Sequence, residues 1–332
     1  MILVGDIGGT HVRLALFESV DSKDSLWHVE YFKSKELADF QQLVGEYLKK
    51  MKVVPQAACF GFPGPVINGK VQLTNLPWSI EIEKLSEVCG TRHTFLINDL
   101  EAAAYGVTVL GAKDSVIIQD GKASSKGCKA LIAPGTGLGE AGLRWENGRY
   151  VPFPSEGAHV DFAPRNELEI GLFRYLHSLF GHVSYERVLS GPGLLNIYRY
   201  LKSTGRGCLE KNPIEEEIEQ SEDPAQSITF HGLAKDCSLC VQSLELFVSL
   251  LGAEAGNLAL KFLASGGVYI AGGIVPHIIE KLKEPLLIES FCDKGRLSYF
   301  LKTIPIIVVV TPFLGIYGAL RYVQETALLR SI

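Results

Sequence analysis

The sequence predicts an α/β protein with two domains. At about 150 residues per domain, 332 residues correspond to about two domains, and an apolar content of 47% suffices for two cores. Apolar strand patterns alternate with helical patterns early in the chain, whereas helical patterns dominate from residue 166 onward. We therefore expect a small α/β domain at residues 1–110, completed by a C-terminal helix at 315–332, and a larger α-rich α/β domain at 111–314.

The first predicted element is a β-hairpin. The apolar segments Ile2–Val4 and Val12–Phe17 flank Gly8 and Gly9, which is the pattern of two strands joined by a tight turn. Further strands are predicted at Ala57–Phe60, Phe95–Ile97 and Val116–Ile118, and helices at Ala38–Lys50 and Leu100–Gly106. This alternation is typical of a sheet covered by helices.

A second glycine-rich hairpin begins the larger predicted domain. The strand Leu131–Ala133 leads through Gly135–Gly139 into strands at Glu140–Trp145 and from Tyr150 onward. Helices are predicted at Leu168–Phe180, Gly193–Lys202 and Asp236–Ala264, and a solvated loop or short exposed helix at Thr204–Ser227. The chain closes with a strand at Val268–Ala271, a short helix ending at Lys283, a strand at Ile304–Val310 and a helix at Ile316–Leu329.

Charge and composition argue against several classes of partner. Lys and Arg number 32 and Asp and Glu 37, so the net charge is −5, and we expect no nucleic-acid binding. The apolar stretch Ile304–Leu320 is interrupted by Pro305 and Pro312, so it does not predict a membrane span. The N-terminus is unlike a signal peptide, and seven cysteines without framework spacing fit a reducing cytoplasm. We expect a cytoplasmic protein.

Two glycine-rich loops each join a pair of predicted strands. In Asp6–Thr10 and Gly135–Gly139, exposed backbone N–H groups and the hydroxyls of Thr10 and Thr136 can face an anion. A single loop of this kind is most often only a turn, but two in the same context favour a polyphosphate. Neither loop is followed directly by a helix, which argues against dinucleotide-binding and Walker-type sites.

Two other motifs are better explained as ordinary structure. Gly64–Lys70 matches the Walker spacing, but Val71 replaces the metal-binding Ser or Thr, and Asn68-Gly69 predicts a hairpin turn. Cys237 and Cys240 lack a second metal-binding pair and lie in a helical pattern, so we expect buried or idle thiols.

Asn98 and Asp99 lie where a predicted strand ends and a helix begins, the edge that carries ligands in α/β folds. Asn98 with Glu101 also fits a helix capping box, which explains the asparagine but not Asp99. An aspartate at this edge can accept a hydroxyl proton, and Asn98 can both donate to and accept from polyol hydroxyls.

Three side chains in predicted loops also suit a polyol. The carboxylates of Glu156 and Glu186 can accept hydrogen bonds from vicinal hydroxyls, and His159 can donate or accept, although each alone is more often a surface charge. Gly272 and Gly273 follow a predicted strand and allow a nucleobase or ribose to lie against the backbone. A plain strand-to-helix turn stays open as the alternative.

In number and order, these motifs resemble the bacterial-type glucokinases of the hexokinase and actin-like ATPase superfamily over nearly the whole chain. The matching segments are Asp6–Thr10, Leu96–Asp99, Ala133–Gly139, Glu156–Pro164, Glu186–Gly191 and Ala271–Ile274.

The resemblance implies a two-lobed actin-like ATPase (ribonuclease H-like) fold and ATP-dependent phosphorylation of glucose at its 6-hydroxyl, the first step of glycolysis, in a cleft between the domains. It implies that Asp99 is the general base and also contacts the sugar. The remaining implied contacts are sugar hydroxyls for Asn98, Glu156, His159 and Glu186, Mg²⁺ for Asp6, phosphates for Asp6, Gly8, Gly9, Thr10, Gly135, Thr136 and Gly137, and adenosine for Gly272 and Gly273.

Other proteins with related motifs serve as alternatives. A hexose or N-acylhexosamine kinase of the repressor/ORF/kinase type carries a zinc-binding cysteine cluster, which this sequence lacks. A sugar-responsive repressor needs a DNA-binding helix-turn-helix, and a filament protein has no use for a polyol pocket. Ala158 stands where many relatives carry glycine, so the range of hexoses stays open. Glucose and ATP are the expected partners, and the resemblance is also compatible with a homodimer.

Overall fold

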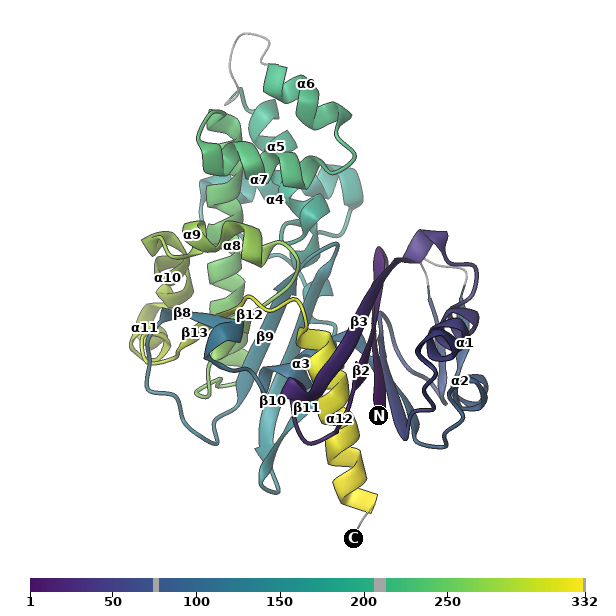
Figure 1. The fold of residues 1–332 in the computed structure, drawn as a ribbon. Helices are drawn as coiled ribbons and strands as arrows, with labels where there is room; N and C mark the ends of the chain where they lie inside the picture. Colours follow the sequence, from purple (N-terminus) through teal and green to yellow (C-terminus); the bar gives the residue numbers. More distant parts are fainter. Residues whose placement is uncertain (74–77, 206–212, 331–332) are drawn as a thin grey trace. The chain divides into compact units, whose positions relative to one another are not determined.

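The computed structural model describes residues 1–73, 78–205 and 213–330, and the chain divides into two compact units (Figure 1). The first unit comprises Met1–Lys113, Arg149–Phe153 and Thr311–Ile332, and the second Asp114–Gly148 and Pro154–Val310. The domain boundary near residue 110 that the sequence suggests stays a prediction.

The first unit is built on a five-stranded sheet in the order β3-β2-β1-β4-β7. Strand β1 (Ile2–Ile7) pairs antiparallel with β2 (His11–Phe17), which pairs antiparallel with the edge strand β3 (Leu26–Lys33). On its other side β1 runs parallel to β4 (Ala57–Phe62), and β4 runs parallel to β7 (Thr94–Asn98). The carboxyl ends of β1, β4 and β7 therefore meet at one edge.

Helices cover both faces of this sheet because the side chains of the central strands are apolar on both. Leu3 packs with Phe40 of α1 (Phe40–Met51) and near α2 (Ile82–Cys89), whereas its neighbour Val4 packs with α12 (Leu314–Arg330). Helix α3 (Asp99–Val107) lies against α12 (Figure 1). The smaller elements are β5 (Lys70–Gln72), β6 (Ser79–Glu81), η1 (Lys23–Ser25) and η2 (Ser34–Glu36).

The second unit repeats the combination of a hairpin with parallel strands in a six-stranded sheet, β11-β10-β9-β12-β13-β8. Its hairpin is β9 (Lys129–Pro134) with β10 (Leu138–Glu146), and β9, β12 (Val268–Ile270) and β13 (Ile306–Val309) are parallel. The edge strands are β8 (Ser115–Gln119) and β11 (Arg149–Ser155). Residues 149–153 of β11 belong to the first unit.

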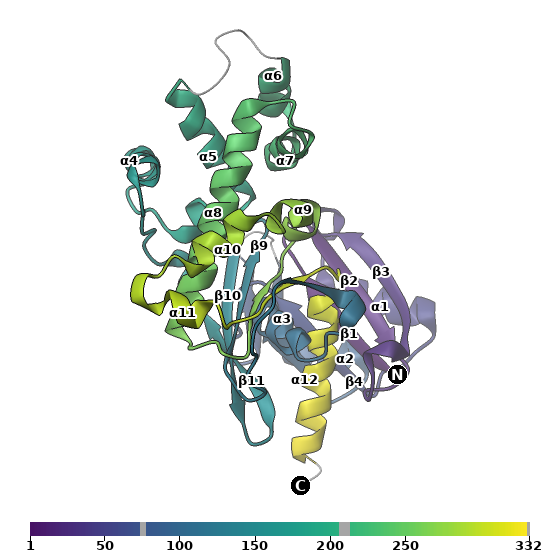
Figure 2. The same ribbon diagram turned by 90° about the vertical axis from the view of Figure 1, so that its left-hand side faces the viewer.

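Helix α8 (Ser238–Lys261) is the centre of the second unit. Figure 2 shows it among α5, α7 and α10, which all pack against it. It is long and apolar enough to cross a membrane, but 78% of its apolar window is buried, which is typical of a core helix. The other helices and turns are η3 (Ala112–Asp114), η4 (Gly157–His159), α4 (Glu167–Phe180), η5 (Tyr185–Arg187), α5 (Gly191–Ser203), α6 (Pro213–Gln220), α7 (Pro224–Ala234), η6 (Val275–Ile278), α9 (Ile279–Leu282), α10 (Pro285–Cys292), η7 (Gly295–Leu297) and α11 (Ser298–Leu301).

The prediction for Thr204–Ser227 is partly wrong, and residues 206–212 of that stretch lie outside the described residues. Helix α6 is a short helix as expected, but Pro224 opens a second helix, α7, rather than a loop. Asp223 caps α7 by accepting a hydrogen bond from the Gln226 N–H, with a proline at the first helical position. The sequence carried this signal next to the acidic run that obscured it.

The Walker-like segment and the cysteine pair both form ordinary structure, as predicted. Asn68 and Gly69 adopt positive φ angles of 50° and 72°, and Ile67 and Lys70 exchange backbone hydrogen bonds across them, so the Walker-like segment is a hairpin turn. Cys237 and Cys240 are buried free thiols at the start of α8. Among the described residues, no group of three His, Cys, Asp or Glu side chains is arranged to hold a metal.

Helices α3 and α12 cross in backbone contact. A Cβ at Gly318 of α12 would overlap the carbonyl oxygen of Ala102, and one at Gly106 of α3 would overlap the carbonyl oxygen of Leu314. No side chain fits at either position, so the two glycines set the distance between the helices.

Replacing Gly318 with alanine should therefore separate α3 from α12 and lower the free energy of unfolding by roughly 3 kcal/mol, the upper range for overpacking. Equilibrium urea unfolding measures the change as a lower midpoint. Gly45→Ala in α1 is the matched control, because its Cβ would lie 3.5 Å from Val88 and alanine favours the helix by about 0.5–1 kcal/mol. Equal midpoints for Gly318→Ala and the parent chain would contradict the steric argument.

Candidate active site

Acidic and amide side chains gather at the edge of the first sheet where its parallel strands end. The register places Asp6 of β1 opposite Gly61 of β4, and Phe62 of β4 opposite Asn98 of β7. A Cβ at Gly61 would lie 3.6 Å from the Cα of Asp99, so the start of α3 lies close over β4. The structure thus brings Asp6, Asn98 and Asp99 to one edge, as expected for a ligand site.

Asn98 is held in place by four hydrogen bonds. Its Oδ1 accepts from the N–H groups of Leu100 (2.9 Å) and Glu101 (3.2 Å), and its Nδ2 donates to the Gly64 carbonyl (3.1 Å). The carboxylate of Glu101 in turn accepts from the Asn98 backbone N–H, which completes the predicted capping box. The cap fixes where the next residue, Asp99, begins the helix.

Asp99 occupies the first position of α3 and is half-buried. Its Oδ1 accepts a hydrogen bond from the Leu100 N–H at 2.9 Å, and the positive end of the helix dipole favours its charged form. A carboxylate fixed at a strand end in this way is suited to accepting a proton from a bound hydroxyl.

Asp6 is paired with a residue that the sequence analysis did not select, Arg13. Arg13 Nη1 donates to Asp6 Oδ2 at 2.9 Å and to the Pro312 carbonyl at 3.0 Å. Burial raises the pKa of the Asp6 carboxyl, and the charge and hydrogen bond of Arg13 offset part of that rise. A signal was available, because a hairpin with this turn places residues 6 and 13 opposite each other.

The first glycine loop is held from behind by Ser34, which is fully buried. Ser34 donates its hydroxyl to the Gly8 carbonyl (2.8 Å) and its N–H to the Thr10 carbonyl (2.9 Å). A Cβ at Gly9 would meet nothing within 4 Å. Gly9 is therefore not required by packing within the protein, and the exposed loop has room for a ligand against its backbone. The sequence offered no signal for Ser34.

The second glycine loop lies beside two other segments predicted to bind ligands. Gly135 accepts a backbone hydrogen bond from Gly191 at the start of α5 (2.8 Å), and Glu186 Oε2 accepts from the Leu138 N–H (3.0 Å). Gly272 has a φ of +95° and no room for a Cβ beside Pro134. The structure therefore brings Gly135, Thr136, Gly137, Gly272, Gly273 and Glu186 together.

Glu156 and His159 belong to the exposed turn η4, with 3.9 Å between His159 Nε2 and Glu156 Oε2. The Val160 carbonyl accepts a hydrogen bond from the Tyr185 N–H (3.2 Å), so η4 lies beside η5 and hence beside Glu186. Ala158, the middle residue of η4, is buried in the hydrophobic core of the second unit.

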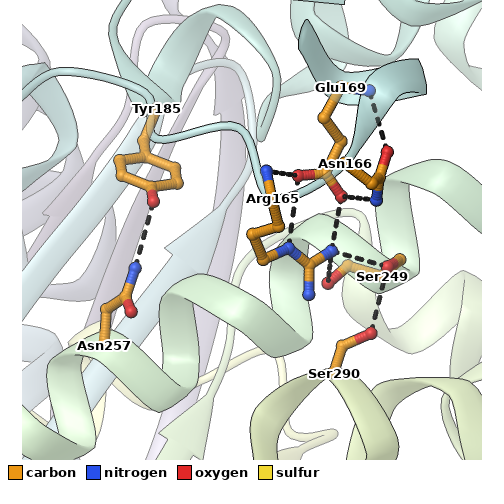
Figure 3. A network of polar contacts seen from close by, with 7 residues as sticks. All are labelled: Arg165, Asn166, Glu169, Tyr185, Ser249, Asn257 and Ser290. Atoms are coloured by element: carbon orange, nitrogen blue, oxygen red, sulfur yellow. Dashed lines mark hydrogen bonds and ion pairs between the residues drawn. The ribbon is translucent and has the colours of Figure 1, made fainter. Parts of the chain in front are cut away.

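Figure 3 shows a polar network around Arg165, which follows η4 in the chain, and Tyr185, the residue before Glu186. The guanidinium of Arg165 binds the buried carboxylate of Glu169 at 2.6 Å and the Ser249 hydroxyl at 2.8 Å. Tyr185 accepts a hydrogen bond from Asn257 Nδ2 at 3.0 Å. Tyr185, next to Glu186, is thus tied to α8, and Arg165, after η4, is tied to α4 and α8.

The site residues therefore form one group in each unit. In the first unit, Asp6 and Asp99 supply carboxylates beside an anion-compatible loop. In the second, carboxylates and an imidazole lie beside a second such loop. Carboxylate, amide and imidazole groups suit a polyol, and the loops suit phosphates.

Comparison with known proteins gives consistent results. A family model described as glucokinase matches residues 3–326. A glucokinase of Nostoc punctiforme is 39% identical over 96% of this chain and 97% of its own length. The crystal structure of a glucokinase from an Antarctic psychrotroph superposes with a TM-score of 0.84 at 30% identity, covering 98% of each chain. A ROK family glucokinase from Streptomyces griseus, solved with glucose and AMPPNP, shares the fold at a TM-score of 0.62 and 17% identity, covering 98% of this chain and 99% of its own. The expected actin-like ATPase fold is confirmed.

Removing the helix cap at Asn98 should lower the stability of the first unit. Asn98→Ala leaves the first N–H groups of α3 without their acceptor and should lower the free energy of unfolding by about 1 kcal/mol. Urea unfolding measures this, with Asn98→Asp as the control because aspartate caps a helix about as well as asparagine. If Asn98→Ala is as stable as the parent chain, the cap does not hold the start of α3.

Proposed function

The chain belongs to the glucokinase family, and from that premise we propose that it transfers the terminal phosphoryl group of ATP to the 6-hydroxyl of glucose. The family match over residues 3–326 is the observation that carries the proposal. A kinase of the repressor/ORF/kinase type is less favoured, because the curated relatives with near-complete coverage are glucokinases. The described residues also hold no metal-binding cysteine cluster.

We assign the sugar to the polar residues outside the glycine loops. Glu156, His159 and Glu186 accept from and donate to vicinal hydroxyls, and the Asn98 amide supplies a further contact. The short distance between Glu156 and His159, and their exposure on η4, support this role. Because such a site leaves its polar groups unpaired when a hydroxyl is misplaced, it discriminates between epimers.

We assign the phosphates of ATP to the two glycine loops. Gly8, Gly9 and Thr10 in one loop and Gly135, Thr136 and Gly137 in the other offer backbone N–H groups and hydroxyls, and Gly272 and Gly273 border the adenosine. Asp6 is the candidate Mg²⁺ ligand. Its carboxylate keeps one oxygen outside the Arg13 contact, and Mg²⁺ needs only one or two protein carboxylates when phosphates complete its shell. Bound there, the ion would neutralise phosphate charge.

We assign the proton transfer to Asp99. The carboxylate takes the proton of the glucose 6-hydroxyl, the oxygen forms a bond to the terminal phosphorus, and the bond to ADP breaks. Positioning supplies most of the catalysis in such transfers, which fits a carboxylate fixed by a capped helix start.

The remaining expectations concern the surroundings of the enzyme. The described cysteines Cys59, Cys89, Cys128, Cys237, Cys240 and Cys292 are free, which supports a cytoplasmic location. The net charge of −5 supports a role without nucleic acid. The homodimer stays a prediction.

A coupled assay of purified protein with glucose, ATP and Mg²⁺ tests the function directly. We expect glucose 6-phosphate and ADP in equal amounts, with little ADP formed in the absence of sugar. A panel containing mannose, galactose and N-acetylmannosamine distinguishes a glucokinase from the alternative hexosamine kinase. A faster rate with an N-acylated sugar than with glucose would overturn the assignment.

Asp99→Asn should retain glucose binding but lower kcat by roughly 10²–10⁴-fold, because asparagine keeps the shape and cannot accept the proton. Steady-state kinetics measure kcat, and calorimetry measures glucose binding. Asp120→Asn, an exposed aspartate after β8, is the control and should behave as the parent chain. Near-normal turnover of Asp99→Asn would exclude the general-base role.

Thr136→Val should lower kcat/KM for ATP by about 10- to 150-fold, since losing a hydrogen bond to a charged phosphate costs about 1.5–3 kcal/mol. The KM for glucose should change little. Thr303→Val, another exposed threonine, serves as the control. If ATP kinetics are unaltered, the Gly135–Gly139 loop is only a turn.

A further inference from the structure

Glu140 is a buried carboxyl that none of the roles above uses. It lies in β10, two residues after Leu138, and is only 1% exposed. Neither of its carboxylate oxygens has a hydrogen-bond partner among the residues that the structure describes. An unpaired buried carboxylate is costly, so its position calls for an explanation.

The carboxyl of Glu140 lies directly against the turn that carries the proposed sugar ligands. A Cβ at Gly157 would overlap Glu140 Oε2, and it would lie 3.0 Å from the hydroxyl of Ser155. That hydroxyl accepts the Gly157 N–H at 2.9 Å. Gly157 is the first residue of η4, between Glu156 and His159. Any displacement of the Glu140 carboxyl therefore acts on this turn.

The charged side chain with the largest effect on Glu140 is another carboxylate, Glu254. Glu254 of α8 is fully buried and accepts hydrogen bonds from Asn257 (2.7 Å) and Lys261 (3.2 Å). Burial and the Glu254 charge raise the pKa of Glu140 to about 7, and Lys261 offsets part of the rise.

The other elements around Glu140 also carry titratable groups. Tyr185 and Glu186 lie on η5, and the turn itself carries Glu156 and His159. Burial and the charge of Glu254 raise the pKa of Tyr185, so this phenol stays neutral near pH 7. Tyr185 also shares a hydrogen bond with Glu254. It accepts another from Asn257, which Figure 3 shows. The same α8 carboxylate thus supports η5 and acts on Glu140.

We propose that Glu140 is a positioning residue for the sugar-binding turn and that its protonation controls glucose affinity. This inference rests on the proposed role of Glu156 and His159. The neutral carboxyl packs beneath Gly157 and leaves the turn in place. The ionised carboxylate is repelled by Glu254 and lacks a donor, so it moves and displaces the turn. Glucose affinity falls as the pH rises through neutrality, because the neutral form is the competent one.

The pH dependence of the glucose KM tests this proposal. If only the neutral form binds glucose well, the KM of the parent enzyme rises roughly eightfold between pH 6.5 and 8.0. In Glu140→Gln, whose side chain is neutral throughout, this rise should be absent. The two proteins differ only at position 140, so the difference between the two profiles reports Glu140. Glu146→Gln, a half-exposed position of the same strand, should keep the parent profile.

Two further variants keep the test decisive if Glu140→Gln does not fold. Glu254→Gln retains an acceptor for Asn257 but removes a charge that raises the pKa of Glu140. The KM of this variant should therefore begin to rise at lower pH than that of the parent, and the midpoint of its profile should move to lower pH. Gly157→Ala should raise the glucose KM strongly alone and much less in combination with Glu140→Ala, which frees the space.

The outcomes separate this inference from the proposed function. Activity with the same KM profile in Glu140→Gln and the parent, or an unmoved midpoint in Glu254→Gln, overturns the positioning role alone. Additive effects of Gly157→Ala and Glu140→Ala overturn it as well. Absence of glucose-dependent ADP formation at every pH instead overturns the proposed function.

Discussion

The backbone contact between α3 and α12 is the constraint on which the site residues of the first unit depend. Gly106 and Gly318 allow the two helices to touch, and the first turn of each helix lies at a site carboxylate. Helix α3 begins at Asp99, whereas the first turn of α12 lies on Asp6, where a Cβ at Gly315 would come within 2.9 Å of Cγ. Two helices in close backbone contact thus fix the positions of two carboxylates that come from segments far apart in the chain.

In the second unit, hydrogen bonds and a buried ion pair hold the site residues in position. Glu186 accepts a hydrogen bond from the backbone that follows the second glycine loop, and the Arg165–Glu169 pair anchors the chain beyond η4. Buried charges contribute little net stability unless they are fully hydrogen-bonded. The Glu169 carboxylate meets that condition, because Arg165 and Asn166 donate to both of its oxygens, whereas the Glu140 carboxylate has no donor among the described residues.

Local patterns allowed the sequence to predict most elements near the site. Both hairpins, the helix start at Asn98 and the turn at Asn68-Gly69 follow from strand alternation, capping and turn chemistry, which act over a few residues. The edge strand β3 was missed because it exposes Trp27 and Tyr31 and resembles no core strand. Helix α7 was missed because an acidic run concealed its cap at Asp223.

The sequence by itself determined the family and the residue types of the candidate site, because motif order and spacing are properties of the chain. Only the tertiary structure decided what supports those residues. Ser34 behind the first loop and Glu140 beneath Gly157 are 26 and 17 positions from their partners. Such contacts depend on strand pairing and helix packing rather than on neighbouring residues. Burial, which raises the pKa of Glu140, likewise arises only when the second unit closes around it.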